Sequence, residues 1–226
     1  MKYKAVLLDF DGTIADTTRL IVDSWQHTYR TLTGREGEEE FILSTFGETL
    51  RDSLQMAFPE HDVQEAVDVY KSYQMSLQES AWFLFPGIRE MLRALKEQGC
   101  LVGVVTSRTG STCRQGLASC GIEQYIDALV TCDDTTAHKP DPEPALIGLG
   151  LLRGQEGSGS PEGVLTAEEA LFVGDTRFDI DCAHNAGIPA ALVAWSATMK
   201  KEDPVQTWPA EYYLESPEQL VEILRG

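Results

Sequence analysis

The chain has 226 residues, of which 18 are basic and 36 acidic, so its formal net charge at pH 7 is −18. Its 42% hydrophobic content is typical of a globular protein with a substantial core. A strongly acidic surface repels phosphate backbones and anionic headgroups, so we expect neither nucleic acid nor membrane partners.

The first predicted element is a buried strand at Ala5–Leu8, where every residue is apolar. No comparable strand follows between residues 16 and 84, where amphipathic stretches predict helices instead. We therefore expect a helical cap domain at residues 16–84, inserted into a core domain made of residues 1–15 and 85–226. The expected cap helices are Leu20–Leu32, Glu38–Phe46, Leu50–Phe58 and Val63–Leu77.

After residue 85, short apolar runs alternate with helical patterns. A helix is predicted over Ile88–Gln98, and residues 153–163 are rich in Gly and Ser and predict a loop. Capping boxes at Thr166–Glu169 and Ser216–Gln219 predict helix starts. The alternation predicts an α/β fold with a Rossmann-like parallel sheet. Its later strands are expected at Leu101–Val105, Ala128–Val130, Ala170–Val173 and Ala190–Ala194.

The motif Asp9-Phe-Asp-Gly-Thr13 directly follows the first strand. Ligands of parallel sheets bind at the carboxyl ends of the strands. Two carboxylates about 4 Å apart repel by roughly 4 kcal/mol at an effective dielectric of 20. A bound hard cation would offset this repulsion. The alternative is that Asp9 or Asp11 serves only in a turn or a helix cap.

Further polar residues follow other predicted strands. Asp175 and Asp179 form a second acidic pair, which would also suit a helix cap. Thr106 and Ser107 offer hydroxyls at the end of the strand 101–105, where a plain N-cap is the alternative. Lys139 lies in a proline-stiffened loop and would otherwise be an ordinary surface lysine.

These residues would converge on one sheet edge, and together they suit phosphoryl transfer from a monoester. An aspartate can attack phosphorus, and a second acid can protonate the leaving oxygen and later accept a proton from water. Mg²⁺, a lysine and a hydroxyl can hold the phosphoryl oxygens.

Four motifs follow one another along the chain: Asp9–Thr13, the apolar run that ends in Thr106, the proline loop of Lys139, and Gly174–Asp179. In this order they resemble the motifs of haloacid dehalogenase superfamily phosphatases with a helical cap of the C1 type. The resemblance implies Asp9 as nucleophile and Asp11 as general acid and base. It also implies that Thr106, Ser107 and Lys139 bind the phosphate. Mg²⁺ would be bound by Asp9, the backbone carbonyl of Asp11 and Asp175, with Asp179 supporting the site.

Within that superfamily, the chain is most similar to the phosphoglycolate phosphatase and pyrophosphatase branch. Residues 46–50 resemble the substrate loop of the cap, so Gly47, Glu48 and Arg51 are candidate specificity residues. The expected function is Mg²⁺-dependent hydrolysis of a phosphoglycolate-like monoester or of inorganic pyrophosphate. A β-phosphoglucomutase-like phosphotransferase and a non-catalytic phospho-switch or scaffold remain the alternatives.

Three expectations concern the whole protein. The amino-terminal residues show no secretory signal pattern, and the five cysteines form no C-x-x-C pair. We therefore expect a cytoplasmic protein with reduced thiols. Its oligomeric state stays open between monomer and dimer. Closure of the cap over the site would require hinges near Ile14–Thr17 and Phe83–Pro86.

Overall fold

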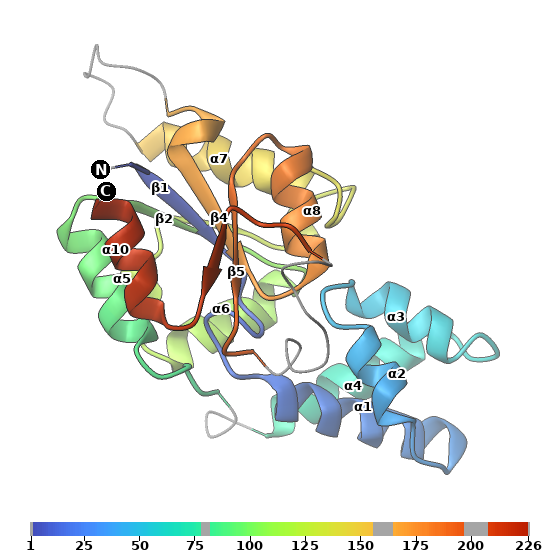
Figure 1. The fold of residues 1–226 in the computed structure, drawn as a ribbon. Helices are drawn as coiled ribbons and strands as arrows, with labels where there is room; N and C mark the ends of the chain where they lie inside the picture. Colours follow the sequence, from blue (N-terminus) through green and yellow to red (C-terminus); the bar gives the residue numbers. More distant parts are fainter. Residues whose placement is uncertain (1, 78–81, 156–164, 197–207, 226) are drawn as a thin grey trace.

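The computed structural model describes residues 2–77, 82–155, 165–196 and 208–225. Six parallel strands form one sheet in the order β3-β2-β1-β4-β5-β6 (Figure 1). The parallel sheet expected from the sequence is confirmed, and it gains the edge strand β6. The strands are β1 (Ala5–Leu8), β2 (Leu101–Val105), β3 (Ala128–Val130), β4 (Ala170–Gly174), β5 (Ala190–Val193) and β6 (Tyr212–Leu214).

Helices cover both faces of the sheet (Figure 1). Alternate residues of each strand point to opposite faces, so Leu8 packs into one apolar cluster and Leu7 into another. This double burial explains why the strands are continuous apolar runs. One face carries α5 (Ile88–Glu97), α6 (Gly110–Ser119) and α10 (Pro217–Arg225), and the other carries α7 (Glu143–Gln155) and α8 (Arg177–Asn185).

Between β1 and α5 the chain forms the helical insert, which we define as α1–α4. Its helices pack around a cluster of their own, in which the ring of Trp25 stacks on Phe58 and meets Tyr70 edge-on. The insert lies beyond the carboxyl edge of the sheet (blue to cyan in Figure 1). The division into domains at residues 16 and 84 stays our interpretation. The helices are α1 (Thr18–Thr33), α2 (Glu39–Ser44), α3 (Leu50–Ala57) and α4 (Val63–Ser76).

The two connections between the insert and the sheet run side by side. Ala15 and Leu84 form an antiparallel bridge. The Asp16 amide donates to the Phe83 carbonyl at 2.8 Å, and the Phe85 amide donates to the Ile14 carbonyl at 3.2 Å. Both expected hinge segments therefore meet at one place, although the motion itself stays a prediction.

Some local expectations need correction. Residues 153–155, expected in a loop, belong to the end of α7, and residues 156–163 lie outside the described part of the chain. The capping box at Thr166 opens only a 3₁₀ turn, Ala167–Glu169, because β4 begins immediately afterwards. Further 3₁₀ turns lie at Glu123–Tyr125 and Cys132–Asp134. Among the described helices, none has both the length and the apolar character needed to cross a bilayer.

Candidate active site

The site begins where three neighbouring strands end. β1 lies between β2 and β4, and Leu8 is in register with Val104 and Val173. The residues that follow these strands therefore reach the same edge of the sheet. Asp9 is anchored there by its amide, which donates to the Val173 carbonyl at 2.9 Å.

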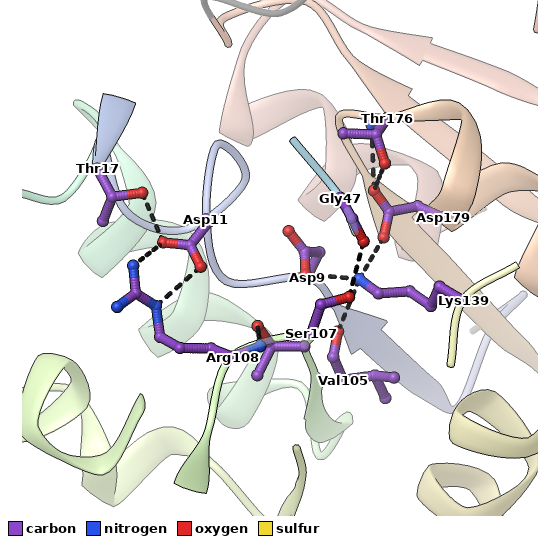
Figure 2. A network of polar contacts seen from close by, with 11 residues as sticks. Asp9, Asp11, Thr17, Gly47, Val105, Ser107, Arg108, Lys139, Thr176 and Asp179 are labelled. Atoms are coloured by element: carbon purple, nitrogen blue, oxygen red, sulfur yellow. Dashed lines mark hydrogen bonds and ion pairs between the residues drawn. The ribbon is translucent and has the colours of Figure 1, made fainter. Parts of the chain in front are cut away.

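Lys139 lies with its ammonium between Asp9 and Asp179 (Figure 2). Its ammonium is 2.7 Å from Asp9 Oδ1 and 2.6 Å from Asp179 Oδ1, and it donates to the Val105 carbonyl at 3.3 Å. Its side chain is only 2% exposed. Burial disfavours the ammonium, but Asp179 and Asp9 together raise the pKa of Lys139. The lysine is therefore a buried cation held between two acids.

Asp179 acts both as a capping residue and as a member of the site. The amide and hydroxyl of Thr176 donate to its Oδ2 at 3.0 and 2.7 Å, which completes a capping box at the start of α8. Its other oxygen faces Lys139 (Figure 2). A Cβ on Gly174 would come within 2.3 Å of Asp179, so the absence of a side chain there lets the carboxylate approach the strand end.

The acidic cluster fits a divalent cation. Carboxylate oxygens of Asp9, Asp175 and Asp179, all buried, lie within 4.8 Å of one another. With Lys139 included, three carboxylates and one ammonium leave two negative charges to be balanced. Burial and the neighbouring acids Asp179, Asp175 and Asp11 raise the pKa of Asp9 well above its usual value, although Lys139 opposes this. Hard oxygen donors in this number suit Mg²⁺.

The turn after β1 comes very close to this cluster. Gly12 has a φ of +78°, and a Cβ there would lie 2.1 Å from Asp175 Oδ2. The absence of a side chain at Gly12 therefore lets the backbone beside Asp11 approach Asp175, while the role of the Asp11 carbonyl stays a prediction. The hydroxyl of Ser196 donates to the same oxygen, Asp175 Oδ2, at 2.6 Å.

The carboxylate of Asp11 turns toward Arg108 (Figure 2). Arg108 Nε donates to Oδ2 at 2.8 Å and Nη2 donates to Oδ1 at 2.6 Å. The Thr17 hydroxyl also donates to Oδ1, at 2.6 Å. Arg108 is buried, yet Asp11 raises its pKa, so the guanidinium stays charged.

The hydroxyl residues after β2 lie between the sheet and the insert. Thr106 is buried, and its Oγ1 accepts from the Arg108 amide at 3.2 Å. The Ser107 hydroxyl donates to the Gly47 carbonyl at 2.8 Å (Figure 2). Of the other expected cap residues, Glu48 lines the cavity, whereas Arg51 is exposed and donates to Gln64 on the insert.

A cavity of about 110 Å³ lies between the sheet edge and the insert. Residues expected from the sequence form part of its wall, namely Asp9, Asp11, Gly47, Glu48, Thr106, Ser107, Lys139 and Asp175. Lys71, Gln74 and Arg108 also line it, although they were not predicted as site residues. Arg108 directly follows Thr106 and Ser107, so its position next to these two candidate residues could have predicted it. Lys71 and Gln74 lie in the amphipathic helix α4, and no sequence pattern distinguishes them from its other polar residues.

Comparison with known proteins shows which family the chain resembles. A sequence model described as haloacid dehalogenase-like hydrolase matches residues 6–193. The pyrophosphatase PpaX of Bacillus anthracis (strain CDC 684) is 32% identical over 224 residues, which cover 99% of this chain and 97% of that protein.

Solved structures share the fold. A crystal structure from Bacteroides fragilis matches with a TM-score of 0.83 and 26% identity, covering 97% of this chain and 100% of the other. A "predicted phosphoglycolate phosphatase" from Haemophilus somnus matches with a TM-score of 0.80 and 21% identity, covering 99% and 98%. The family model covers most of the chain, and the relative from Bacillus anthracis is more than 30% identical over nearly the whole of both chains, so the chain belongs to the haloacid dehalogenase-like hydrolases.

Proposed function

We propose that the chain is a Mg²⁺-dependent phosphohydrolase that cleaves pyrophosphate or a small phosphoglycolate-like monoester. The observation that carries the proposal is the position of Asp9, a buried carboxylate that lines the cavity beside a buried lysine. The similarity to a protein named pyrophosphatase PpaX supports an anhydride substrate.

In the proposed reaction, an oxygen of Asp9 attacks phosphorus while the bond from phosphorus to the leaving oxygen breaks. Asp11 gives a proton to that oxygen. Asp11 then accepts a proton from water, which attacks the phosphorus carried on Asp9 and releases inorganic phosphate with Asp9 restored. Thr106, Ser107 and Lys139 hold the phosphoryl oxygens during both steps.

Magnesium would be held by Asp9, Asp175 and the backbone carbonyl of Asp11, with Asp179 beside them. When bound, it balances charge on the phosphoryl oxygens and on the acidic cluster. The residues themselves position the reacting groups: Lys139 fixes one oxygen of Asp9, and the Thr176 cap fixes Asp179. The helical insert covers the cavity and limits the access of bulk water to it.

We also propose a cytoplasmic location. The five cysteines are free thiols. Burial raises the pKa of the Cys100, Cys113 and Cys182 thiols to about 12. Thiols with such high pKa values are unreactive, which suits packing residues of a protein in a reducing compartment.

The test is phosphate release from pyrophosphate, phosphoglycolate, sugar phosphates and nucleotides, with Mg²⁺ and with a chelator. Asp9→Asn should lower turnover by about three orders of magnitude or more, as expected for loss of a nucleophile. Asp23→Asn, a control on an exposed pair with Arg19, should leave turnover unchanged.

Each outcome separates the candidate functions. Turnover that survives Asp9→Asn contradicts the covalent mechanism. No turnover of any substrate with Mg²⁺ contradicts the hydrolase proposal and favours a switch or scaffold. Conversion of a sugar phosphate into its isomer without phosphate release indicates a mutase.

A further inference from the structure

The ion pair between Arg108 and Asp11 uses both oxygens of the acid that the proposed function needs for proton transfer. Two nitrogens of Arg108 and the Thr17 hydroxyl donate to them, at 2.6 to 2.8 Å. In this arrangement Asp11 faces the guanidinium. Asp11 must leave Arg108 before one of its oxygens can approach a leaving group.

Arg108 is held by other contacts that do not depend on Asp11. Its Nη1 donates to Gln74 Oε1 on α4 at 3.2 Å. The guanidinium carbon lies 4.9 Å from the ring centre of Trp82 and 5.9 Å from that of Phe10. Stacking on aromatic rings and hydrogen bonding to the amide keep the planar group in place. The arginine is therefore positioned to accept another anion when Asp11 moves.

Arg108 also has donors to spare. A guanidinium has five N–H groups, and those of Arg108 make three side-chain hydrogen bonds with the described residues. Arg108 lines the cavity two residues after Thr106, and Lys71 of α4 lines it as well. The cavity thus holds two cations besides Lys139, which already pairs with Asp9 and Asp179.

We propose that Arg108 exchanges Asp11 for an anionic group on the leaving part of the substrate. The inference rests on the proposed function and narrows its substrate class. The preferred substrates are phosphorylated compounds whose leaving group carries its own negative charge, such as a second phosphate or a carboxylate. Their binding frees Asp11, so recognition of the leaving group is coupled to release of the acid.

The exchange is favoured by charge and geometry. A guanidinium binds carboxylate and phosphate in the same bidentate manner. Because one anion replaces another, the buried Arg108 is never left without a partner, which would be costly. An uncharged leaving group offers no replacement, so Asp11 stays paired with Arg108 and such a substrate reacts poorly.

Binding measurements test the exchange directly. Inorganic phosphate and imidodiphosphate, a pyrophosphate analogue with a nitrogen bridge, are titrated separately into the full chain with Mg²⁺ present. Arg108→Gln should weaken the binding of imidodiphosphate by about 30-fold or more. This is the lower bound for removing one partner of a buried charge pair. Phosphate affinity should change by less than about threefold, since Lys139 and Thr106 remain. Arg114→Gln is the matched control, because Arg114 is exposed on α6.

A double-mutant cycle tests the competition between Asp11 and the ligand. Asp11→Asn should tighten imidodiphosphate binding when Arg108 is present. The gain should disappear in the Asp11→Asn, Arg108→Gln double variant. If Arg108→Gln does not fold, Arg108→Lys, which keeps the charge but not the fork, replaces it throughout. The proposal is overturned if Arg108→Gln lowers the affinities for phosphate and imidodiphosphate equally. It is also overturned if Asp11→Asn gives the same gain in imidodiphosphate affinity without Arg108.

Kinetics separate this proposal from the one on which it rests. The ratio of kcat/KM for pyrophosphate to that for ethyl phosphate, whose leaving group is an uncharged alcohol, should fall in Arg108→Gln. An unchanged ratio would show that Arg108 only positions Asp11, and it would overturn the inference while leaving the hydrolase intact. Absence of turnover of every phosphate by the unaltered chain would instead refute the proposed function.

Discussion

Lys139 is a single residue on which the acidic cluster depends for folding as well as for chemistry. Its ammonium contacts Asp9 and Asp179 at 2.7 and 2.6 Å, and all three side chains are buried. Lys139→Met would leave both carboxylates without their cation. We expect the free energy of unfolding, measured with urea in metal-free buffer, to fall by about 3–5 kcal/mol.

The control for this prediction is Lys4→Met. Lys4 pairs with Glu169 at 2.6 Å, but its side chain is 47% exposed. Water screens such a pair, so the change should stay below about 1 kcal/mol. Equal losses in the two variants would mean that burial adds nothing to the role of Lys139.

Gly12 is the second residue with a sharply defined role. Alanine there would combine an unfavourable positive φ with a Cβ 2.1 Å from Asp175 Oδ2. Gly99 has nearly the same φ, +76°, but open space around its Cβ position. Gly99→Ala should therefore cost only the backbone strain, about 1–2 kcal/mol. Gly12→Ala should lower the free energy of unfolding, measured with urea, by more than Gly99→Ala does. It should also weaken the binding of Mg²⁺ measured by calorimetry. Similar losses of stability with intact Mg²⁺ affinity would contradict this account.

At the scale of elements, the edge strand β6 is fastened to β5 through Glu211. Its carboxylate accepts from the Ala190 amide at 2.7 Å and contacts His184 at 3.2 Å. Partial burial opposes ionisation, but the hydrogen bonds from Ala190 and His184 lower the pKa of Glu211 overall. A carboxyl whose pKa is lower in the folded state stabilises the fold above its unfolded pKa. This contribution is lost as pH falls through the folded pKa.

We therefore expect Glu211→Gln to be less stable than the unaltered chain at pH 7. The loss should be about 0.5–1 kcal/mol, because solvent screens a side chain that is 48% exposed. The difference should vanish when unfolding is measured at acidic pH, below the pKa of both states. Glu222→Gln on the exposed side of α10 is the control. A difference that persists unchanged in acid would show that the charge of Glu211 is irrelevant.

The elements differ in how far their sequences reveal them. The central strands were predictable because burial on both faces makes them continuously apolar. β6 was missed because Tyr212 and Tyr213 are only half-buried, so the strand lacks that pattern. α7 was missed because its residues 144–152 are nearly all apolar or glycine, and no polar face alternates with a buried one. Part of it was therefore assigned to the loop that follows.

The site was predictable where it depends on strand ends and unpredictable where it depends on the insert. Asp9, Thr106 and Asp175 follow strands, so sheet topology alone brings them together. The partner of Asp11 lies 97 residues away in the chain, and its position depends on Gln74 and Trp82 as well. Such contacts follow from how the insert sits on the sheet, and no local pattern encodes that.

At the scale of the whole molecule, the helical insert touches the sheet edge through few polar contacts among the residues that the structure describes. The Ser107 hydroxyl donates to the Gly47 carbonyl, and Arg108 donates to Gln74. Opening of the insert would break both. The paired connections at Asp16 and Phe83 lie outside the cavity lining and would serve as the pivot. Because the insert has its own apolar cluster, we expect it to move as a unit that keeps this cluster buried.

Closure should respond to ligand, and hydrogen exchange can measure it. With Mg²⁺ and imidodiphosphate, amides of residues 45–48 should exchange more slowly, while amides of β1 and β2, already in the sheet, should not change. Because Ser107 also holds a phosphoryl oxygen in the proposed reaction, each protein is measured with the ligand at saturation. Ser107→Ala then removes one closing hydrogen bond worth about 1 kcal/mol, so it should reduce the ligand-induced protection about fivefold. Ser111→Ala, an exposed residue near the start of α6, should not. Closure is refuted if the ligand leaves exchange in the insert unchanged. If protection rises equally in all three proteins, the ligand itself, rather than the contact between Ser107 and Gly47, orders the loop.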